Sequence, residues 1–271
     1  MPKVSVSVLM AFYNEIPQRL KRSIDSLVGQ TFQDWELIIV DDASTNDAKN
    51  ILLGYRDARI KLINKEQNRG LTKSLNLAAQ SAKGKYLARL DSDDYCLPER
   101  LAKQWEFMQA NGDYVVCGTR YQEEYESKLW PQSVQFLEHH EALKNALSCF
   151  NPLAHSTLFF RQEAFSIVGG FDERVVYAQD FDLLVRFSKI GKLKNLNEVL
   201  VVRNMDADRI SVRKDKKQLI SALRSRARAM LSHGITLKAI VSWLRSLVVL
   251  MLPSAVLRCL RGVGTKQFLK L

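Results

Sequence analysis

The sequence has few cysteines, and their spacing matches no familiar site. The four cysteines, at positions 96, 117, 149 and 259, lie far apart and form no C-x-x-C pair. This spacing excludes a disulfide framework and a zinc site, and it fits a reducing compartment. The N-terminus lacks the apolar core and cleavage site of a signal peptide, so we expect a cytoplasmic protein.

Glycine-rich phosphate loops and long apolar runs are also missing. Neither G-x-x-x-x-G-K-[ST] nor a G-x-G-x-x-G after the first apolar strand is present. A bound diphosphate would therefore depend on a metal ion for most of its neutralising charge. Near the C-terminus, the twelve uncharged residues between Arg245 and Arg258 are interrupted by Pro253. Because a span needs about 20 apolar residues, this stretch is too short to cross a bilayer.

The net charge of +11 is concentrated at one end of the chain. Residues 212–271 contain 13 lysines and arginines and a single acid, whereas residues 1–211 are close to neutral. We therefore divide the chain into a body, residues 1–211, and a basic tail, residues 212–271.

The first half of the body reads as strands alternating with helices. Strands are expected at 4–12, 35–40, 59–63, 85–90 and 113–117, with helices between them. Further on, the pattern predicts helices at about 136–147 and 179–190 and a strand at 155–160. This order indicates an α/β fold with a mostly parallel central sheet, in which ligands bind beyond the carboxyl ends of the strands. Four polar loops are expected to meet at that edge: 11–15, 41–42, 64–70 and 91–94.

The last of these loops contains three carboxylates in four residues, Asp91-Ser92-Asp93-Asp94. Their mutual repulsion disfavours the cluster unless a cation or hydrogen-bond donors occupy it. A hard divalent ion suits such oxygen ligands, and Mg²⁺ characteristically takes one or two carboxylates together with substrate phosphates. The alternative is a solvated turn that caps the helix after Pro98.

Six segments together resemble the inverting glycosyltransferases of family 2, which have the GT-A fold. They are VSVLMAFYNE (6–15), QTFQDWELIIVDDASTND (30–47), NRGLTKSLN (68–76), GKYLARLDSDDYCLPERL (84–101), VGGFDE (168–173) and QDFDLLVR (179–186). They occur in the family's order and cover about residues 4–211. The resemblance implies a sugar transferase that uses a nucleotide-diphosphate donor and Mn²⁺ or Mg²⁺.

On the donor side, the resemblance implies a role for residues in all four loops. Tyr13 would stack near the base, Asp42 would accept a hydrogen bond from a uracil N–H, and a UDP-sugar is therefore favoured over a GDP- or dTDP-sugar. Asp93 and Asp94 would hold the metal. The full set of implied nucleotide-sugar-binding residues is Ala11, Tyr13, Glu15, Asp42, Asn68, Lys73, Asp91 and Asp93. Ordinary packing for Tyr13, a loop cap for Asp42 and a solvated Lys73 remain as alternatives.

On the acceptor side, Asp180 matches the family's general base, which takes the proton from the acceptor hydroxyl. The chain departs from the family at Gln179, where an acid is usual. His155, Gly170 and Asp172 match positions near the acceptor, although a histidine before an apolar strand is also typical of a core. Arg203 and Ser211 are expected on a loop that closes over the diphosphate.

The tail contains one apolar helical face, formed by Leu237, Ile240, Val241, Leu244, Leu247, Val248 and Met251. A cationic amphipathic helix of this kind lies on anionic membrane surfaces. The alternative is a helix packed on the body. With few aromatics in the tail and no recognised nucleic-acid motif, we expect no nucleic-acid partner.

These observations lead to a specific functional expectation. We expect a peripheral enzyme at the inner face of the cell membrane, acting on a lipid-diphosphate-linked saccharide in the synthesis of an O-antigen, capsule or exopolysaccharide. A non-catalytic protein that binds nucleotide sugars is the rival interpretation.

Overall fold

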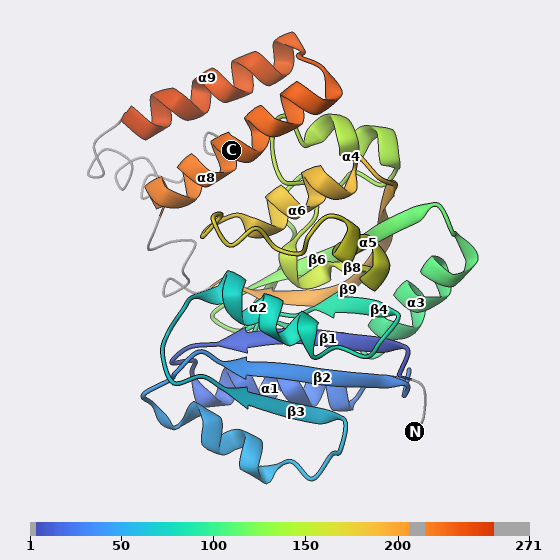
Figure 1. Cartoon of the computed structure of the whole chain (residues 1–271), viewed down its shortest axis with the longest axis vertical. Helices are drawn as coiled ribbons and strands as arrows, with labels where there is room; N and C mark the ends of the chain where they lie inside the picture. Colours follow the sequence, from blue (N-terminus) through green and yellow to red (C-terminus); the bar gives the residue numbers. More distant parts are fainter. Residues whose placement is uncertain (1–3, 206–214, 252–271) are drawn as a thin grey trace.

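The computed structural model describes residues 4–205 and 215–251 (Figure 1). The first half of the chain alternates strands with helices, as the hydrophobic pattern predicts. Its elements are β1 (Val6–Phe12), α1 (Pro17–Val28), β2 (Trp35–Asp41), the 3-10 helix η1 (Asp47–Gly54), β3 (Ile60–Asn64), α2 (Leu71–Gln80), β4 (Tyr86–Arg89), β5 (Tyr95–Cys96) and α3 (Arg100–Ala110).

The second half is built differently, and here the expected elements are only partly correct. The strand expected at 113–117 is longer, and the segment expected as a strand at 155–160 is a 3-10 turn followed by a short strand. A long strand near residue 200 was not expected. The elements are β6 (Tyr114–Tyr125), β7 (Lys128–Pro131), α4 (His140–Ala146), η2 (His155–Thr157), β8 (Phe159–Arg161), α5 (Gln162–Ile167), α6 (Gln179–Phe187) and β9 (Lys192–Asn204).

One mixed sheet runs through the body in the order β3-β2-β1-β4-β8-β6-β9-β5, with β7 paired to β6. Strands β3, β2, β1 and β4 are parallel, as expected. The strand β8 lies between β4 and β6 and is antiparallel to both. The sheet is therefore mostly parallel on the β3 side and mixed on the other, which agrees with the predicted fold class.

Both faces of the sheet are covered, and the side chains of β1 alternate between two cores. Val8 and Met10 pack on one face with the apolar side of α1, including Leu20 and Ile24. Leu9 packs on the opposite face in the core that contains residues of α2 and α6. Because a parallel strand buried on both faces needs apolar residues throughout, the continuous runs of β1 and β2 follow from this position.

The basic tail contributes two helices, α8 (Asp215–His233) and α9 (Leu237–Met251), which form an outer layer beyond α6 (Figure 1). The helix α8 packs on α6, where the guanidinium of Arg228 pairs with the buried carboxylate of Asp182. Within residues 4–205 and 215–251, every helix is too short or too polar to traverse a lipid bilayer.

Candidate active site

Hydrogen bonds join the polar loops at the carboxyl ends of the parallel strands. After β1, Asn14 accepts the backbone N–H of Thr45 at 2.7 Å. The neighbouring Glu15 accepts the hydroxyl of Ser92, in the acidic loop, at 2.9 Å. These contacts bring the first, second and fourth loops together, as the sheet topology predicts.

Asp42 joins the second loop to the third. It is 4% exposed, and its carboxylate accepts the backbone N–H groups of Arg69 and Gly70 at 3.0 and 2.7 Å. The ammonium of Lys65 adds an ion pair to the same carboxylate. A carboxylate offers about four acceptor positions, so these three donors leave room for one more. The loop cap that was the alternative for Asp42 is therefore real, and it is compatible with a further contact to a ligand.

The other residues expected on the donor side lie around this edge with different exposures. Ala11 is buried in β1 beside Val40 of β2, so only its backbone can border a ligand. Tyr13 is 51% exposed, which leaves its ring available for stacking. Asn68 and Lys73 are both exposed, on the third loop and the first turn of α2.

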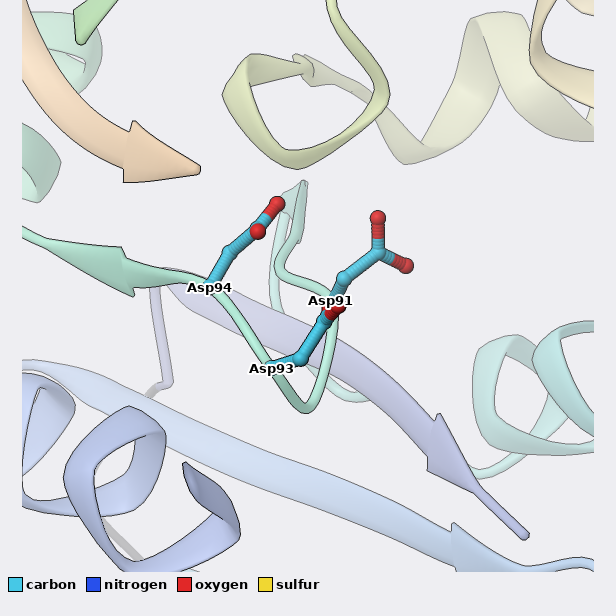
Figure 2. Close-up of side chains that lie close together, drawn as sticks. All are labelled: Asp91, Asp93 and Asp94. Atoms are coloured by element: carbon cyan, nitrogen blue, oxygen red, sulfur yellow. The ribbon is translucent and has the colours of Figure 1, made fainter. Parts of the chain in front are cut away.

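The acidic loop connects β4 to β5 and brings its three carboxylates together (Figure 2). One oxygen from each of Asp91, Asp93 and Asp94 lies within 4.8 Å of the others, close enough to hold a cation. The three side chains nevertheless have different surroundings, and these surroundings separate their roles.

Asp91 is held by a buried arginine and a serine. The guanidinium of Arg89, which is fully buried, pairs with its carboxylate. Ser156 Oγ lies 3.0 Å from Asp91 Oδ2 and accepts the backbone N–H of Asp91 at 3.1 Å. The carboxylate of Asp91 is thus fixed by neighbours from β4 and η2.

Asp94 is the most deeply buried of the three, at 1% exposed. It accepts the backbone N–H of Asn204 at 2.8 Å and the hydroxyl of Ser156. Arg203 lies 3.8 Å away and stacks over Tyr121. Although burial opposes it, the carboxylate of Asp94 raises the pKa of Arg203. Arg203 is therefore near the end of β9 rather than on a closing loop as expected, and Ser211 lies outside the described residues.

Asp93 is partly buried and lines a cavity of about 210 Å³. The other walls of this cavity come from α1, from the turn between β6 and β7, and from the end of β9, through Arg19, Arg22, Glu124, Glu126, Ser127 and Asn204. Of the three aspartates, Asp93 lines this cavity, Asp94 is buried, and the side chain of Asp91 is 21% exposed.

The donor set fits a hard divalent cation, and Asp93, which lines the cavity, is a candidate protein ligand. Mg²⁺ needs only one or two carboxylates when phosphates and water complete its shell. The expected role of Asp94 as a ligand stays a prediction, because its carboxylate is directed at Ser156 and Asn204.

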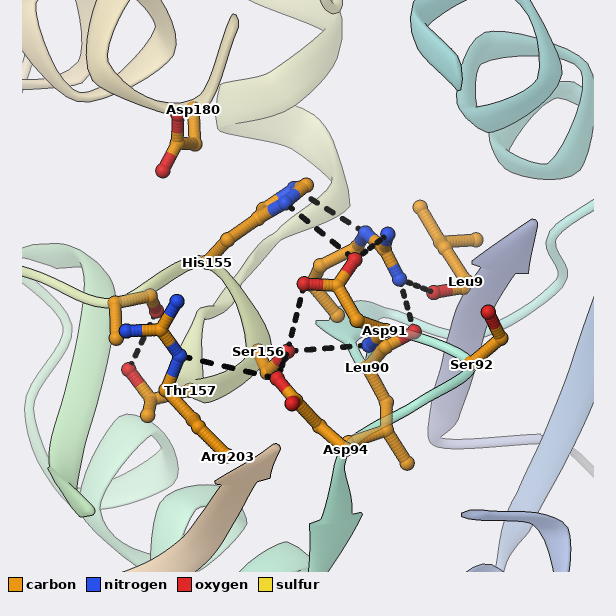
Figure 3. A network of polar contacts seen from close by, with 12 residues as sticks. Leu9, Leu90, Asp91, Ser92, Asp94, His155, Ser156, Thr157, Asp180 and Arg203 are labelled. Carbon is orange, nitrogen blue, oxygen red and sulfur yellow. Dashed lines mark hydrogen bonds and ion pairs between the residues drawn. The ribbon is translucent and has the colours of Figure 1, made fainter. Parts of the chain in front are cut away.

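His155 lies between the acidic loop and Asp180 (Figure 3). Arg89 Nε donates to His155 Nε2 at 3.2 Å, so the ring proton resides on Nδ1, which faces Asp91 at 3.8 Å. Burial, together with the adjacent Arg89 guanidinium, lowers the pKa of His155. This histidine therefore belongs to a polar network and is neutral at pH 7.

Asp180 is in the first turn of α6, where the helix dipole favours a carboxylate. Asn151 donates its amide to Asp180 Oδ2 at 2.8 Å. Within the described part of the chain no hydrogen bond to Oδ1 is found, so that oxygen can receive a proton. Asp182, its competitor, is 1% exposed and pairs with Arg186 and Arg228, which rules it out as a base.

Gly170 and Asp172 shape the turn before α6. Gly169 and Gly170 have φ of +80° and +72°, a left-handed backbone that favours glycine. Asn76 of α2 fixes this turn by accepting the N–H of Phe171 at 3.0 Å. Asp172 accepts hydrogen bonds from Arg174, and these lower the pKa of Asp172 to about 2. The expected place of Asp172 near an acceptor stays a prediction.

Several residues of this site were not identified from the sequence. They are Lys65, Arg89, Asn151 and Ser156, each of which holds a carboxylate in place. Arg89 could have been found, because an arginine inside an apolar strand directly before Asp91 must find a buried anion. Nothing in the pattern around Asn151 or Ser156 signals a partner far away in the sequence.

Comparison with known proteins agrees with this geometry. The model for "Glycosyl transferase family 2" matches residues 7–167, more than half of the chain. This chain belongs to glycosyl transferase family 2. The match covers the donor-side loops and ends before Asp180, so the family assignment rests on the donor half of the site.

Relatives in this family differ in length from the chain. A protein of Bacillus subtilis (strain 168) that carries the name glycosyltransferase EpsE is 34% identical over 215 residues, covering 75% of this chain and 74% of that protein. The hyaluronan synthase of Pasteurella multocida is 29% identical over 77% of this chain, but the chain spans only 21% of it.

A solved structure confirms the fold. Staphylococcus aureus TarS 1-349, determined in complex with UDP, superposes with a TM-score of 0.65 at 21% identity, covering 87% of this chain and 68% of that chain. The predicted α/β fold with flanking helices is therefore confirmed, and the chain is a glycosyltransferase of the family that includes polysaccharide synthases.

Proposed function

We propose that this chain transfers a sugar from a UDP-sugar to a saccharide acceptor, with inversion at the anomeric carbon. The observation that carries the proposal is the placement of the acidic loop and Asp180 on either side of His155 (Figure 3). An oxygen of Asp93 lies within 4.8 Å of oxygens of Asp91 and Asp94 in that loop, and Asp180 faces His155 from α6, where Asn151 holds it.

The acceptor side supports a single-base mechanism. Asn151 holds Asp180 Oδ2, which leaves Oδ1 to take the proton of the acceptor hydroxyl as it attacks the anomeric carbon. A divalent cation, when bound through Asp93, would neutralise charge on the departing diphosphate. The Nε2 of His155 already accepts a hydrogen bond from Arg89, and burial lowers the pKa of His155, so this ring is a weaker base than an ordinary histidine.

The preference for UDP rests on Asp42, which has one acceptor position left after Lys65, Arg69 and Gly70 are satisfied. An N–H of uracil fits such a position. The structural neighbour TarS was solved with UDP and with UDP-GlcNAc, which supports the same preference here. A GDP- or dTDP-sugar remains the alternative donor.

The acceptor that we propose is a lipid-diphosphate-linked saccharide of a bacterial surface polysaccharide, met at the cytoplasmic face of the membrane. The basic tail and the relatives that synthesise polysaccharides support this part of the proposal.

A transfer assay tests the proposal. Purified protein is incubated with UDP-, GDP- or dTDP-sugars, Mn²⁺ or Mg²⁺, and short synthetic lipid-diphosphate saccharides, and the anomeric configuration of the product is measured by NMR. We expect transfer from a UDP-sugar, with inversion. Binding of UDP without any hydrolysis or transfer would favour the rival, a non-catalytic nucleotide-sugar-binding protein.

A further inference from the structure

The helix α9 packs against α8 and the body with its polar side, which a surface helix usually exposes to solvent. Its buried positions are Ala239 and Ser246, and Ser246 accepts a hydrogen bond from the buried Arg226 of α8. Ser242, on the same side, donates to the backbone carbonyl of Cys149 at 3.2 Å. The inner side of α9 thus carries small and hydroxyl side chains, together with Trp243, whose indole N–H donates to the carbonyl of Leu223 in α8 at 3.3 Å.

The opposite side of α9 carries large apolar residues that are exposed. They occupy one continuous stripe over four turns: Leu237 (77% exposed), Ile240 (39%), Val241 (40%), Leu244 (51%), Val248 (61%) and Met251 (85%). A surface helix of a globular protein normally turns such a stripe toward the core. The inverted arrangement indicates that the stripe is matched to an apolar environment outside the protein.

Charge identifies that environment. The only charged residues on α9 are Lys238 and Arg245, both exposed and both along one border of the stripe. Residues 252–271 add four more bases and no acid. A second copy of this chain would present the same positive border and be repelled, whereas anionic lipid headgroups are attracted to it. At 15 residues, α9 is about 22 Å long, which suits lying in an interface and not spanning it.

We propose that the outer stripe of α9 inserts into the surface of an anionic membrane, with Lys238 and Arg245 at the headgroups. This proposal rests on the proposed function only in giving membrane binding a purpose. It places the membrane surface at a defined position relative to the body. The helix α8 is fixed to α6 by Arg228 and Asp182, and by a hydrogen bond between His233 and Ser188 at 3.0 Å. The membrane surface is therefore held at a constant orientation to Asp180.

Vesicle flotation of the full-length protein tests this surface. We compare vesicles of phosphatidylcholine alone with vesicles of equal parts phosphatidylglycerol and phosphatidylcholine. The unmodified protein is expected to float with the anionic vesicles, and Leu244→Gln/Val248→Gln is expected to lower the partition coefficient at least tenfold. The matched control, Leu53→Gln/Ile167→Gln, changes two apolar residues that are 81% and 66% exposed elsewhere, and it should float like the unmodified protein.

A second pair of variants tests the charges. Lys238→Gln/Arg245→Gln should weaken binding to anionic vesicles about 25-fold, about fivefold for each charge, while the control Lys49→Gln/Arg56→Gln should not. Circular dichroism and UDP binding, measured on every variant, show that the body is folded and separate this question from that of the enzymatic activity.

Three results would overturn the proposal. The first is flotation of Leu244→Gln/Val248→Gln to the same extent as the unmodified protein, and the second is no flotation of the unmodified protein at all. The third is a dimer in the absence of lipid, detected by light scattering, that these two substitutions dissociate, because the stripe would then cover a second copy.

Discussion

Exchanging each of two neighbouring aspartates for asparagine should have opposite consequences. Asp94 is 1% exposed, and its carboxylate accepts the hydroxyl of Ser156 and the N–H of Asn204. In Asp94→Asn, Asn204 and Ser156 contact a neutral amide in place of a carboxylate, so two hydrogen bonds to a charged group are weakened. Arg203, 3.8 Å away, also loses its nearest negative charge.

The size of the effect follows from these contacts. A hydrogen bond to a charged group contributes about 1.5–3 kcal/mol, and the weakened ion pair adds to that, so we expect a loss of about 3 kcal/mol. For a domain of this size the melting temperature should fall by about 10 °C. Asp93→Asn instead removes one of three clustered negative charges from a cavity wall, so the melting temperature should be unchanged or slightly higher.

Metal binding should show the reverse order. In Asp93→Asn, Mn²⁺ in the presence of UDP should bind at least tenfold more weakly by isothermal titration calorimetry. In Asp94→Asn, measured at a temperature where the protein is folded, the affinity should change much less. Thermal unfolding without metal completes the comparison. If Asp94→Asn melts normally and loses Mn²⁺ binding, Asp94 is a ligand, and the distinction drawn from burial is wrong.

Three further predictions concern the base, the tail and pH. Asp180→Asn should lower the rate of sugar transfer by about 10³-fold, since general-base catalysis contributes about 10²–10⁴-fold, and it should leave the affinity for UDP unchanged. An unchanged turnover rate would assign the base to another residue. Arg228→Met should lower the melting temperature, measured by calorimetry, by only about 2–4 °C, because Asp182 keeps Arg186 as a partner and Arg228 is itself partly exposed. An unchanged melting temperature would mean that the ion pair between α6 and α8 does not contribute to stability. Burial lowers the pKa of His140, whose Nδ1 accepts a backbone N–H, so the unfolded chain takes up a proton that the folded chain refuses. Stability should therefore fall as pH drops below the ordinary histidine pKa of about 6.5, by at most about 1.4 kcal/mol per pH unit for this group. Denaturant unfolding at pH 7 and pH 5 should show a smaller difference in His140→Gln, and an equal difference would locate the effect in other residues.

The parallel half of the fold could be predicted because its information is local. The strands β1 and β2 are buried on both faces, so their apolar runs are continuous and stand out in the sequence. The strand β9 could not be found in the same way. Its first half reads KLKNLNE, and it forms a strand because it pairs with β6, some eighty residues earlier. Pairing over that distance leaves no periodic signal.

The same limit applies to the site. Asp42, Asp93 and Asp180 could be predicted as site residues because each belongs to a motif with a family likeness, and the first two also follow predicted strands. The partners that hold these carboxylates come from other segments. The hydroxyl of Ser156 meets the acidic loop only because β8 is placed beside β4, and antiparallel insertion of a three-residue strand is not encoded in any local pattern.

The tail shows how a correct periodicity can leave the orientation open. The spacing of Leu237, Leu244 and Val248 predicts one apolar face, and α9 has that face. The usual expectation is that such a face packs inward. Its outward direction follows from Ala239 and Ser246 on the other side, which permit close approach to α8.

The short segment between α4 and β8 has a consequence for how the enzyme can diverge. Within eight residues, Cys149 contacts α9, Asn151 holds Asp180, and Ser156 holds Asp91 and Asp94. A single short peptide therefore contacts both the carboxylate of Asp180 and the acidic loop. Adding or deleting one residue there would shift the acceptor relative to the donor while both half-sites stayed intact, and relatives with a different length at this point are expected to glycosylate a different hydroxyl.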